Sequence, residues 1–448
     1  MLSEDKERLV EELRKLLRQP SVSAQDIGVE ECARLLQELM SNSGIETEVH
    51  QLPGGHPVVL GKVSSKTSRK TLLIYSHYDV QPPDPLEEWK HDPFSAELED
   101  GVIYARGASD AKNNLMTTVK AAEYYLTRFG DVPVNLKFLF EGEEEIESPH
   151  LPEFIERNKA DLKADAVVCF DGETDRSGRP AITLGVKGML YVELRCGGLK
   201  SDLHSSFAPV VPNPVWRLVN ALQTLRRPDG EVAIENWYRN VLPPTPEQTK
   251  MLMEIPFDEE ELKERFGLHS FLNDLKGIEA VKALIFNPTC TICGIKAGYS
   301  GPGLKTVLPR EATATMDFRL VPNQNAAELL EALRKHLIEK GFEDVEVRVI
   351  GSSDPSRTPA DAEIAEVSMK AAEEAYRMKP VVYPNSAGSA PDYLFTKVLG
   401  LDSVWTGSSP PYANIHAPNE FTTVDSYLKG IAYAAAIMEK FGKPPSST

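Results

Sequence analysis

Three apolar stretches of this 448-residue sequence each end in a histidine or in acidic residues. His77 follows the first stretch, the acidic run 141–145 follows the second, and Asp171 follows the third. If the stretches are buried strands of a parallel sheet, these residues lie at one edge, where binding sites form. Crowded carboxylates repel one another unless a cation neutralises them. The pattern therefore predicts a metal site at the ends of three strands.

Two more residues extend the candidate set. Asp110 begins a helix predicted over 110–129, and His416 lies in a loop before the last predicted helix. Taken alone, Asp110 is typical of a helix N-cap. Carboxylates and imidazoles together, however, are ligands that suit Zn²⁺, Mn²⁺ or Co²⁺, and one carboxylate can bridge two ions roughly 3.5–4 Å apart. Asp79, two residues after His77, is placed to fix the orientation of that ring.

An α/β fold is predicted to position these residues. Short apolar segments alternate with amphipathic helical patterns in the first and last parts of the chain, which indicates βαβ units and a mostly parallel sheet flanked by helices. The first helical pattern starts after Ser3, a predicted N-cap. The predicted strands of this sheet are Val58–Val63, 71–75, 134–140, Ala166–Phe170, Val381–Tyr383 and Ser403–Thr406.

The middle of the chain has a different pattern, with strands and helices that we expect to form a smaller α+β domain inserted into the first. The region 243–266, which prolines interrupt, is not assigned. The predicted elements are strands over 181–194, 289–296, 311–320 and 345–350, and helices over Pro214–Leu225 and around 329–337. The resulting division is a first domain formed by 1–184 and 355–448, and a second formed by 185–354.

Composition argues against several classes of protein. Lys and Arg total 49 and Asp and Glu total 67, for a net charge of −18, which disfavours nucleic-acid and anionic-membrane partners. No apolar run approaches the roughly 18 residues of a membrane span. The N-terminal sequence is charged and lacks a signal-peptide core, and five cysteines are too few for a disulfide framework. We therefore expect a cytoplasmic protein.

The order of the motifs resembles that of the co-catalytic zinc peptidases. This family includes carnosinase-type dipeptidases, glutamate carboxypeptidases, aminoacylases, acetylornithine deacetylase and succinyl-diaminopimelate desuccinylase. The segments HYDVQP from His77, WKHDPF from Trp89 and DFRLVPN around Arg319 are most similar to the cytosolic non-specific dipeptidase branch. The resemblance implies a catalytic α/β domain interrupted by a lid, here 185–354, through which two chains commonly pair as a homodimer.

The resemblance also implies a ligand set for two divalent ions, with zinc as the expected metal and manganese or cobalt as alternatives. His77 and Asp171 would hold one ion, Glu145 and His416 the other, and Asp110 would bridge both.

Further roles follow from the same resemblance. Glu144 would be the general base and Asp79 would orient His77. In substrate binding, His204 would reach into the partner chain's site and polarise the scissile carbonyl, and Arg319 would bind the substrate's C-terminal carboxylate. The other positions that match residues near the substrate are Thr306, Gly388 and Ser389. The implied reaction is hydrolysis of the amide bond in dipeptides or short peptides.

Two departures from the family pattern leave an alternative open. The stretch 111–113 replaces the usual acidic, glycine-containing sequence after the bridging aspartate, and Ser386 stands where dipeptidases have an acid. Loss of that acid leaves room for a deacylase of N-acyl amino acids. A non-catalytic dimeric scaffold and a serine or cysteine hydrolase are more distant alternatives. No G-x-S-x-G motif is present, and Cys290-x-x-Cys293 has no second pair and alternates like a strand.

Overall fold

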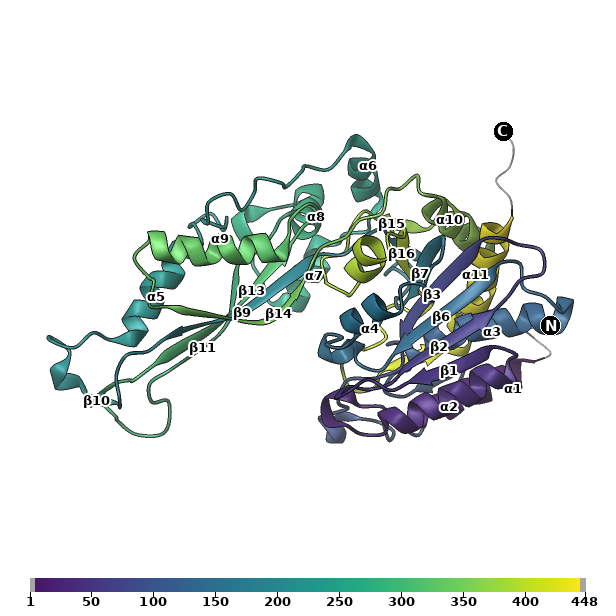
Figure 1. Cartoon of the computed structure of the whole chain (residues 1–448), viewed down its shortest axis with the longest axis horizontal. Coiled ribbons are helices and arrows are strands. Elements are labelled where there is room, and N and C mark those ends of the chain that lie inside the picture. Colours follow the sequence, from purple (N-terminus) through teal and green to yellow (C-terminus); the bar gives the residue numbers. More distant parts are fainter. Residues whose placement is uncertain (1–4, 444–448) are drawn as a thin grey trace.

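The computed structural model describes residues 5–443, so the predicted N-cap Ser3 lies outside the described part. Its largest sheet has eight strands, with helices on both faces (Figure 1). In spatial order, the strands are β1 (Glu46–His50), β2 (Val58–Val63), β6 (Asn135–Glu141), β3 (Thr71–His77), β7 (Ala166–Phe170), β16 (Ser403–Thr406), β8 (Ala181–Thr183) and β15 (Val381–Tyr383).

Parallel pairing in the centre of this sheet brings three strand ends together. β6, β3, β7 and β16 pair in parallel, whereas β1, β2 and β6 pair antiparallel and β8 runs antiparallel to β16. His77, the last residue of β3, lies opposite Glu141 at the end of β6, and β7 ends one residue before Asp171. The predicted α/β class, with a mostly parallel sheet, is confirmed.

Side chains alternate between the two faces of the central strands, and helices cover both faces. Ile74 and Phe138 contribute to the core on one face, whereas Tyr75 and Leu139 contribute to the core on the other. The first core includes α1 (Lys6–Leu17), α2 (Val29–Asn42), α3 (Lys112–Phe129), α10 (Glu363–Tyr376) and α11 (Val424–Gly442). The second includes α4 (Leu151–Arg157) and the π-helix η6 (Leu394–Val398).

A second sheet, of four antiparallel strands, is built from the middle of the chain. Its strands in spatial order are β11 (Thr291–Ala297), β13 (Ala312–Leu320), β9 (Gly188–Cys196) and β14 (Glu346–Ser353). α5 (Pro214–Leu225) and α9 (Ala326–Glu339) form the core of this part together with the sheet. A short ladder of β10 (Leu203–His204) and β12 (Val307–Leu308) extends from it, and β10 lies at the end far from the eight-stranded sheet (Figure 1).

The single strand predicted over 181–194 is wrong, because the chain changes sheets inside that range. β8 ends at Thr183 in the eight-stranded sheet, and β9 starts at Gly188 in the four-stranded sheet. Gly185 and Gly188 pack so closely against the backbone of 353–357 that a side chain at either position would overlap with it. Residues 184–188 are all buried, so the apolar pattern continues through the crossing and gives no sign of it.

The unassigned region contains two helices, α6 (Pro246–Glu254) and α7 (Glu259–Phe266), and is followed by α8 (Gly277–Phe286). Thr245 caps α6 and forms a capping box with Gln248. Leu252 and Ile285 form a small separate core, and Tyr383 of β15 packs against it. α6 therefore rests with α8 on the edge of the eight-stranded sheet, although both helices come from the middle of the chain.

The remaining strands form a small sheet of β17 (Phe421–Thr423), β5 (Val102–Tyr104) and β4 (Glu97–Glu99). Among the described residues, no helix has the length and apolar character needed to cross a membrane.

Candidate metal centre and active site

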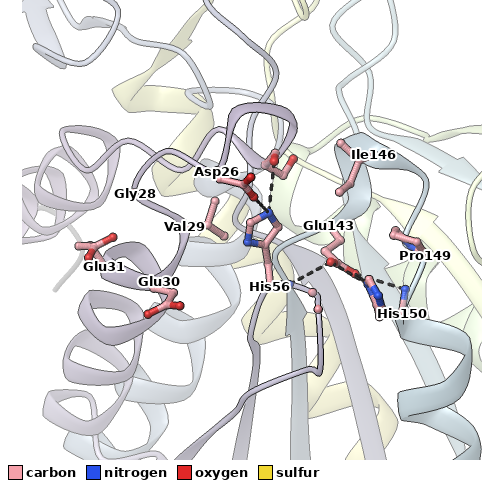
Figure 2. A pocket seen from close by; sticks show the side chains of 13 residues that line it. Asp26, Gly28, Val29, Glu30, Glu31, His56, Glu143, Ile146, Pro149 and His150 are labelled. Carbon is pink, nitrogen blue, oxygen red and sulfur yellow. Dashed lines mark hydrogen bonds and ion pairs between the residues drawn. The ribbon is translucent and has the colours of Figure 1, made fainter.

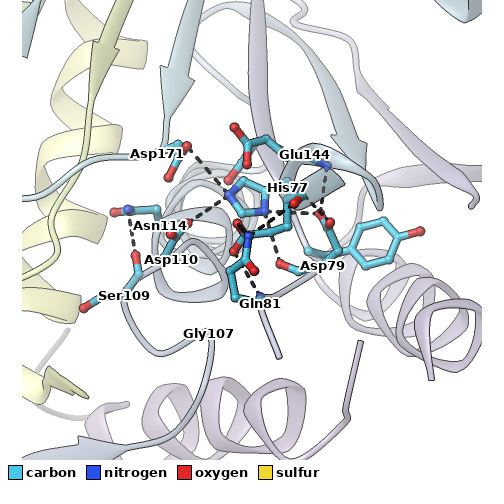
Figure 3. A network of polar contacts seen from close by, with 12 residues as sticks. His77, Asp79, Gln81, Gly107, Ser109, Asp110, Asn114, Glu144 and Asp171 are labelled. Carbon is cyan, nitrogen blue, oxygen red and sulfur yellow. Dashed lines mark hydrogen bonds and ion pairs between the residues drawn. The ribbon is translucent and has the colours of Figure 1, made fainter. Parts of the chain in front are cut away.

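His77 and two aspartates meet at the ends of neighbouring strands. The fully buried His77 ring directs Nε2 to Asp110 Oδ1 at 3.1 Å and to Asp171 Oδ2 at 3.7 Å (Figure 3). β3 delivers His77, the residue after β7 is Asp171, and Asp110 precedes α3. The ends of β3 and β7 therefore bring His77 and Asp171, which are 94 positions apart in the sequence, into one cluster.

A second group of side chains shares the same aspartate. His416 Nε2 lies 2.8 Å from Asp110 Oδ2 and 3.2 Å from Glu145 Oε2. Asp110 thus presents one carboxylate oxygen to each histidine. Ligand atoms of His77, Asp110 and Asp171 lie within 4.8 Å of one another, as do those of Asp110, Glu145 and His416.

The donor set fits a pair of divalent transition-metal ions. It consists of imidazole nitrogens and carboxylate oxygens, the ligand types that zinc, manganese and cobalt accept. The carboxylate common to both groups has the arrangement that a bridging ligand needs, because its two oxygens face different groups.

The electrostatics of the cluster also indicate a cation site. Burial raises the pKa of Glu144 well above its usual range, and the nearby carboxylates of Asp171, Asp110 and Glu145 raise it further. Burial likewise raises the pKa of Glu145. Hydrogen bonds to Asp110 and Glu145 raise the pKa of His416 to about 10. Protons and histidine charges thus partly offset the repulsion between carboxylates, and metal cations would take over that role.

Asp79 supports His77 from the side opposite the cluster. Its Oδ1 lies 3.3 Å from His77 Nδ1, and its own carbonyl oxygen is 3.2 Å from the same nitrogen. This arrangement favours a proton on Nδ1 and leaves Nε2 facing Asp110, where a metal ion would displace any proton that Nε2 carries. The Asp79 carboxylate is itself fixed, because it accepts hydrogen bonds from Ser23 Oγ at 2.7 Å and from the Glu145 amide at 3.1 Å.

The acidic run 141–145 divides between different surroundings. Glu141 is buried and accepts a hydrogen bond from the Tyr75 hydroxyl at 2.6 Å. Glu143 accepts the His56 amide at 2.9 Å and lies 3.0 Å from His150 Nδ1 (Figure 2). Neither residue belongs to the two candidate ligand groups. Of the run, therefore, only Glu145 belongs to a candidate ligand group, and Glu144 lies beside the cluster (Figure 3).

A cavity of about 550 Å³ opens beside Glu143, and no member of the two candidate ligand groups lines it (Figure 2). Its lining includes Ser23, Asp26, His56, Glu143 and His150. His56 and His150 contact Glu143 here and belong to neither candidate ligand group.

Three of the predicted substrate-binding positions come together near the start of β9. Arg319 donates from Nη1 to Ser389 Oγ at 2.7 Å and from Nε to Asp317 Oδ2 at 2.9 Å. The Lys187 amide donates to the Gly388 carbonyl at 2.9 Å. Burial lowers the pKa of Lys187 to about 8, and the neighbouring Arg319 charge adds to this effect. The group is positively charged, which suits an anionic ligand.

The other two predicted positions lie together elsewhere. His204 of β10 pairs with Val307, and the Ser205 amide donates to the Thr306 carbonyl at 3.1 Å. His204 is exposed, at the end of the second sheet that is far from the His77 cluster (Figure 1). Within one chain, therefore, His204 and Thr306 do not join the candidate metal centre.

Sequence reasoning missed supporting residues around the cluster. Gln81 donates to Glu145 Oε1 through its amide at 3.2 Å and to Oε2 through its side chain at 2.9 Å. The strand-end pattern could have indicated Gln81, because it follows His77 by four residues. Ser23, which holds Asp79, and Lys187 carry no distinguishing signal in the sequence.

Comparisons with known proteins agree with this site and fold. The model of "Peptidase family M20/M25/M40" matches residues 73–440. The Cys-Gly metallodipeptidase dug1 of Schizosaccharomyces pombe is 31% identical over 456 residues, which cover 96% of this chain and 95% of that protein.

Two solved structures share the whole architecture. The M20 family metallo-carboxypeptidase Sso-CP2 from Sulfolobus solfataricus has a TM-score of 0.92 and 40% identity, covering 97% of this chain and 99% of its own. The dipeptidase Dug1p from Saccharomyces cerevisiae has a TM-score of 0.82 and 26% identity, covering 99% and 98%. The expected resemblance to the dipeptidase branch is confirmed, and the chain belongs to the M20/M25/M40 family of metallopeptidases.

Proposed function

We propose that this metallopeptidase hydrolyses the amide bond of dipeptides or short peptides next to a free C-terminal carboxylate. The observation that carries the proposal is the Asp110 carboxylate, which presents one oxygen to each of two histidine-containing groups. The relatives support it, because their names describe a metallodipeptidase, a dipeptidase and a metallo-carboxypeptidase. These names favour a peptidase over a deacylase of N-acyl amino acids and over a non-catalytic scaffold.

The proposed cofactor is a pair of divalent metal ions, with zinc as the first choice and manganese or cobalt as alternatives. His77 and Asp171 would hold one ion, Glu145 and His416 would hold the other, and Asp110 would contact both. When bound, such ions polarise a carbonyl group and lower the pKa of a water molecule. The remaining steps belong to side chains of the protein.

Glu144 is the proposed general base. Burial and the neighbouring carboxylates raise its pKa, which makes it a better proton acceptor near neutral pH. Its carboxylate takes a proton from the attacking water and later delivers it to the leaving amine. Asp79 holds the His77 ring so that Nε2 faces Asp110.

The group around Arg319 is the proposed site for the substrate's C-terminal carboxylate. The planar guanidinium can donate two parallel hydrogen bonds to a carboxylate. Ser389 already contacts Arg319, and Gly388 is held beside it by Lys187. The two cations Arg319 and Lys187 outnumber the one nearby carboxylate, that of Asp317, so this partly buried group favours an anion and would select substrates with a free carboxylate next to the scissile bond.

We also propose the domain division 1–184 and 355–448 for catalysis, and 185–354 for a lid through which two copies pair. The separate sheets support this division. The position of His204 supports a homodimer, because from the far end of the lid it can stabilise a developing oxyanion only in the site of a second copy. Thr306 would accompany it. Trp216 and Val219 expose apolar area on α5 that such an interface could cover.

A cytoplasmic location belongs to the same proposal. All five cysteines of the chain are free, as is usual for proteins of a reducing compartment. The proposed partners are a small peptide substrate and a second copy of the chain, with no nucleic acid or membrane.

Metal-stripped protein should fail to cleave a panel of dipeptides and N-acyl amino acids, and should regain activity when Zn²⁺, Mn²⁺ or Co²⁺ is added. We expect a higher kcat/KM for dipeptides, and faster cleavage of N-acyl amino acids would identify a deacylase instead.

The matched variant Glu144→Gln should bind the same metals, while its kcat falls by about 10²–10⁴. Near-normal turnover by pure Glu144→Gln protein would contradict the assigned role.

A mixing experiment tests whether His204 acts across the dimer. Homodimers of His204→Ala and of Glu144→Gln should each be nearly inactive. Random mixed dimers should recover about a quarter of wild-type activity, because half of the dimers are mixed and each contains one complete site. If His204 acts within its own chain, the mixture should show no recovery.

Metal affinity should rise with pH across the neutral range. Hydrogen bonds to Asp110 and Glu145 raise the pKa of His416 to about 10, so the metal-free imidazole holds a proton that a metal ion must displace. For each proton displaced, we expect roughly tenfold tighter binding per pH unit below that pKa. Competition with a chelator at pH 6, 7 and 8, corrected for protonation of the chelator, would measure the slope. A flat profile would show that no proton is released.

A further inference from the structure

A buried glutamate outside the candidate ligand groups holds the backbone that ends at Asp110. Glu420 lies four residues after His416 and is fully buried. Its Oε1 accepts hydrogen bonds from the amides of Ser109 at 2.8 Å and Asp110 at 3.0 Å. Its Oε2 accepts from the Gly107 amide at 3.0 Å and from the guanidinium of the preceding arginine at 2.7 Å. One carboxylate therefore organises the whole turn before the shared aspartate.

The same residue joins the two loops that carry Asp110 and His416. The Glu420 carbonyl accepts the Ala105 amide at 3.1 Å, and Ser109 Oγ donates to the Phe421 carbonyl at 2.7 Å. β17, which begins immediately afterwards, pairs with β5 just before the turn. The position of His416 relative to Asp110 is thus fixed over a short stretch of paired backbone.

We propose that Glu420 is a positioning residue for the metal centre. Because it accepts hydrogen bonds from the Ser109 and Asp110 amides, it sets the direction in which Asp110 presents its two carboxylate oxygens. The inference rests on the proposed function, because it concerns metal ions that Asp110 would contact. Residues that orient ligands from behind commonly change metal affinity about 10–100-fold when replaced.

The geometry separates this role from that of a buried ion pair. Arg106 uses only Oε2 of Glu420, whereas Oε1 is occupied by the two amides alone. A buried arginine–glutamate pair is by itself weak evidence of stabilisation, and it gives no reason for the contacts at Oε1. The amide contacts are therefore the feature that links Glu420 to Asp110.

Two double variants can distinguish the roles. Both contain Arg106→Met, which removes the ion pair, together with either Glu420→Gln or Glu420→Leu. Glutamine retains one oxygen for the Ser109 and Asp110 amides, whereas leucine retains none. Affinity for Zn²⁺ would be measured by competition with a chelator, and folding of the metal-free proteins by circular dichroism and thermal unfolding. We expect the glutamine variant to bind within about threefold of wild type and the leucine variant at least tenfold more weakly.

Asp392→Asn is a matched control for general loss of stability. Asp392 is also a fully buried carboxylate and accepts hydrogen bonds from Ser403 Oγ at 3.0 Å and Trp405 Nε1 at 2.7 Å, but it contacts none of the candidate ligands. Its replacement should lower the unfolding temperature and leave Zn²⁺ affinity unchanged. If the leucine variant does not fold, Glu420→Asp provides the test, because its shorter side chain cannot reach both pairs of donors and should also weaken binding at least tenfold.

Equal affinity of the two double variants would overturn the inference, whether both bind like wild type or both bind weakly. Weaker Zn²⁺ binding by Asp392→Asn to the same degree would also overturn it, and so would wild-type affinity in Glu420→Asp. A wild-type protein that binds no Zn²⁺ would overturn the proposed function as well. If this inference alone fails, the wild-type protein binds two ions while the two double variants show equal affinity.

Discussion

Repulsion between carboxylates at a buried sheet edge is the constraint on which the rest of the site depends. Asp110, Glu144, Glu145 and Asp171 lie close together, and the imidazoles of His77 and His416 lie among them. Burial raises the pKa of Glu144 and of Glu145, and neighbouring carboxylates raise it further. The fold tolerates this arrangement because protons neutralise part of the negative charge in the metal-free protein, and metal cations would neutralise it in the metal-bound protein. A site built in this way is strained without its cofactor and specific for cations.

Such crowding requires a rigid frame, and the frame comes from distant parts of the chain. Parallel pairing of β3, β6 and β7 fixes one side. Ser23 and Asp79 fix the His77 ring from behind, and Glu420 fixes the backbone of Asp110. In each of these contacts a carboxylate accepts a hydrogen bond from a side chain or a backbone amide. Such hydrogen bonds are stronger than those between neutral groups. The candidate ligand side chains are therefore held in fixed orientations.

Sequence reasoning reached the parts of this design that repeat a simple rule. His77 ends one buried strand and Asp171 follows another, so periodicity and a strand-end argument located them. Asp110 and His416 lie in loops, and the sequence indicated them as metal ligands only in combination with the strand-end residues. In the sequence, Glu420 cannot be distinguished from other acidic residues in loops, because most of its hydrogen-bond partners are backbone amides. The crossing between β8 and β9 was missed for a related reason: buried glycines continue the apolar pattern through it. The distance of His204 from the cluster depends on how the two sheets are arranged, which local patterns do not encode.

The most direct test of the central claim is anomalous X-ray diffraction at the zinc absorption edge from crystals of the zinc-loaded protein. The account predicts two anomalous peaks, one on each side of the Asp110 carboxylate, with His77 and Asp171 at one and Glu145 and His416 at the other. A single peak, or peaks that do not share Asp110, would contradict the two-ion centre.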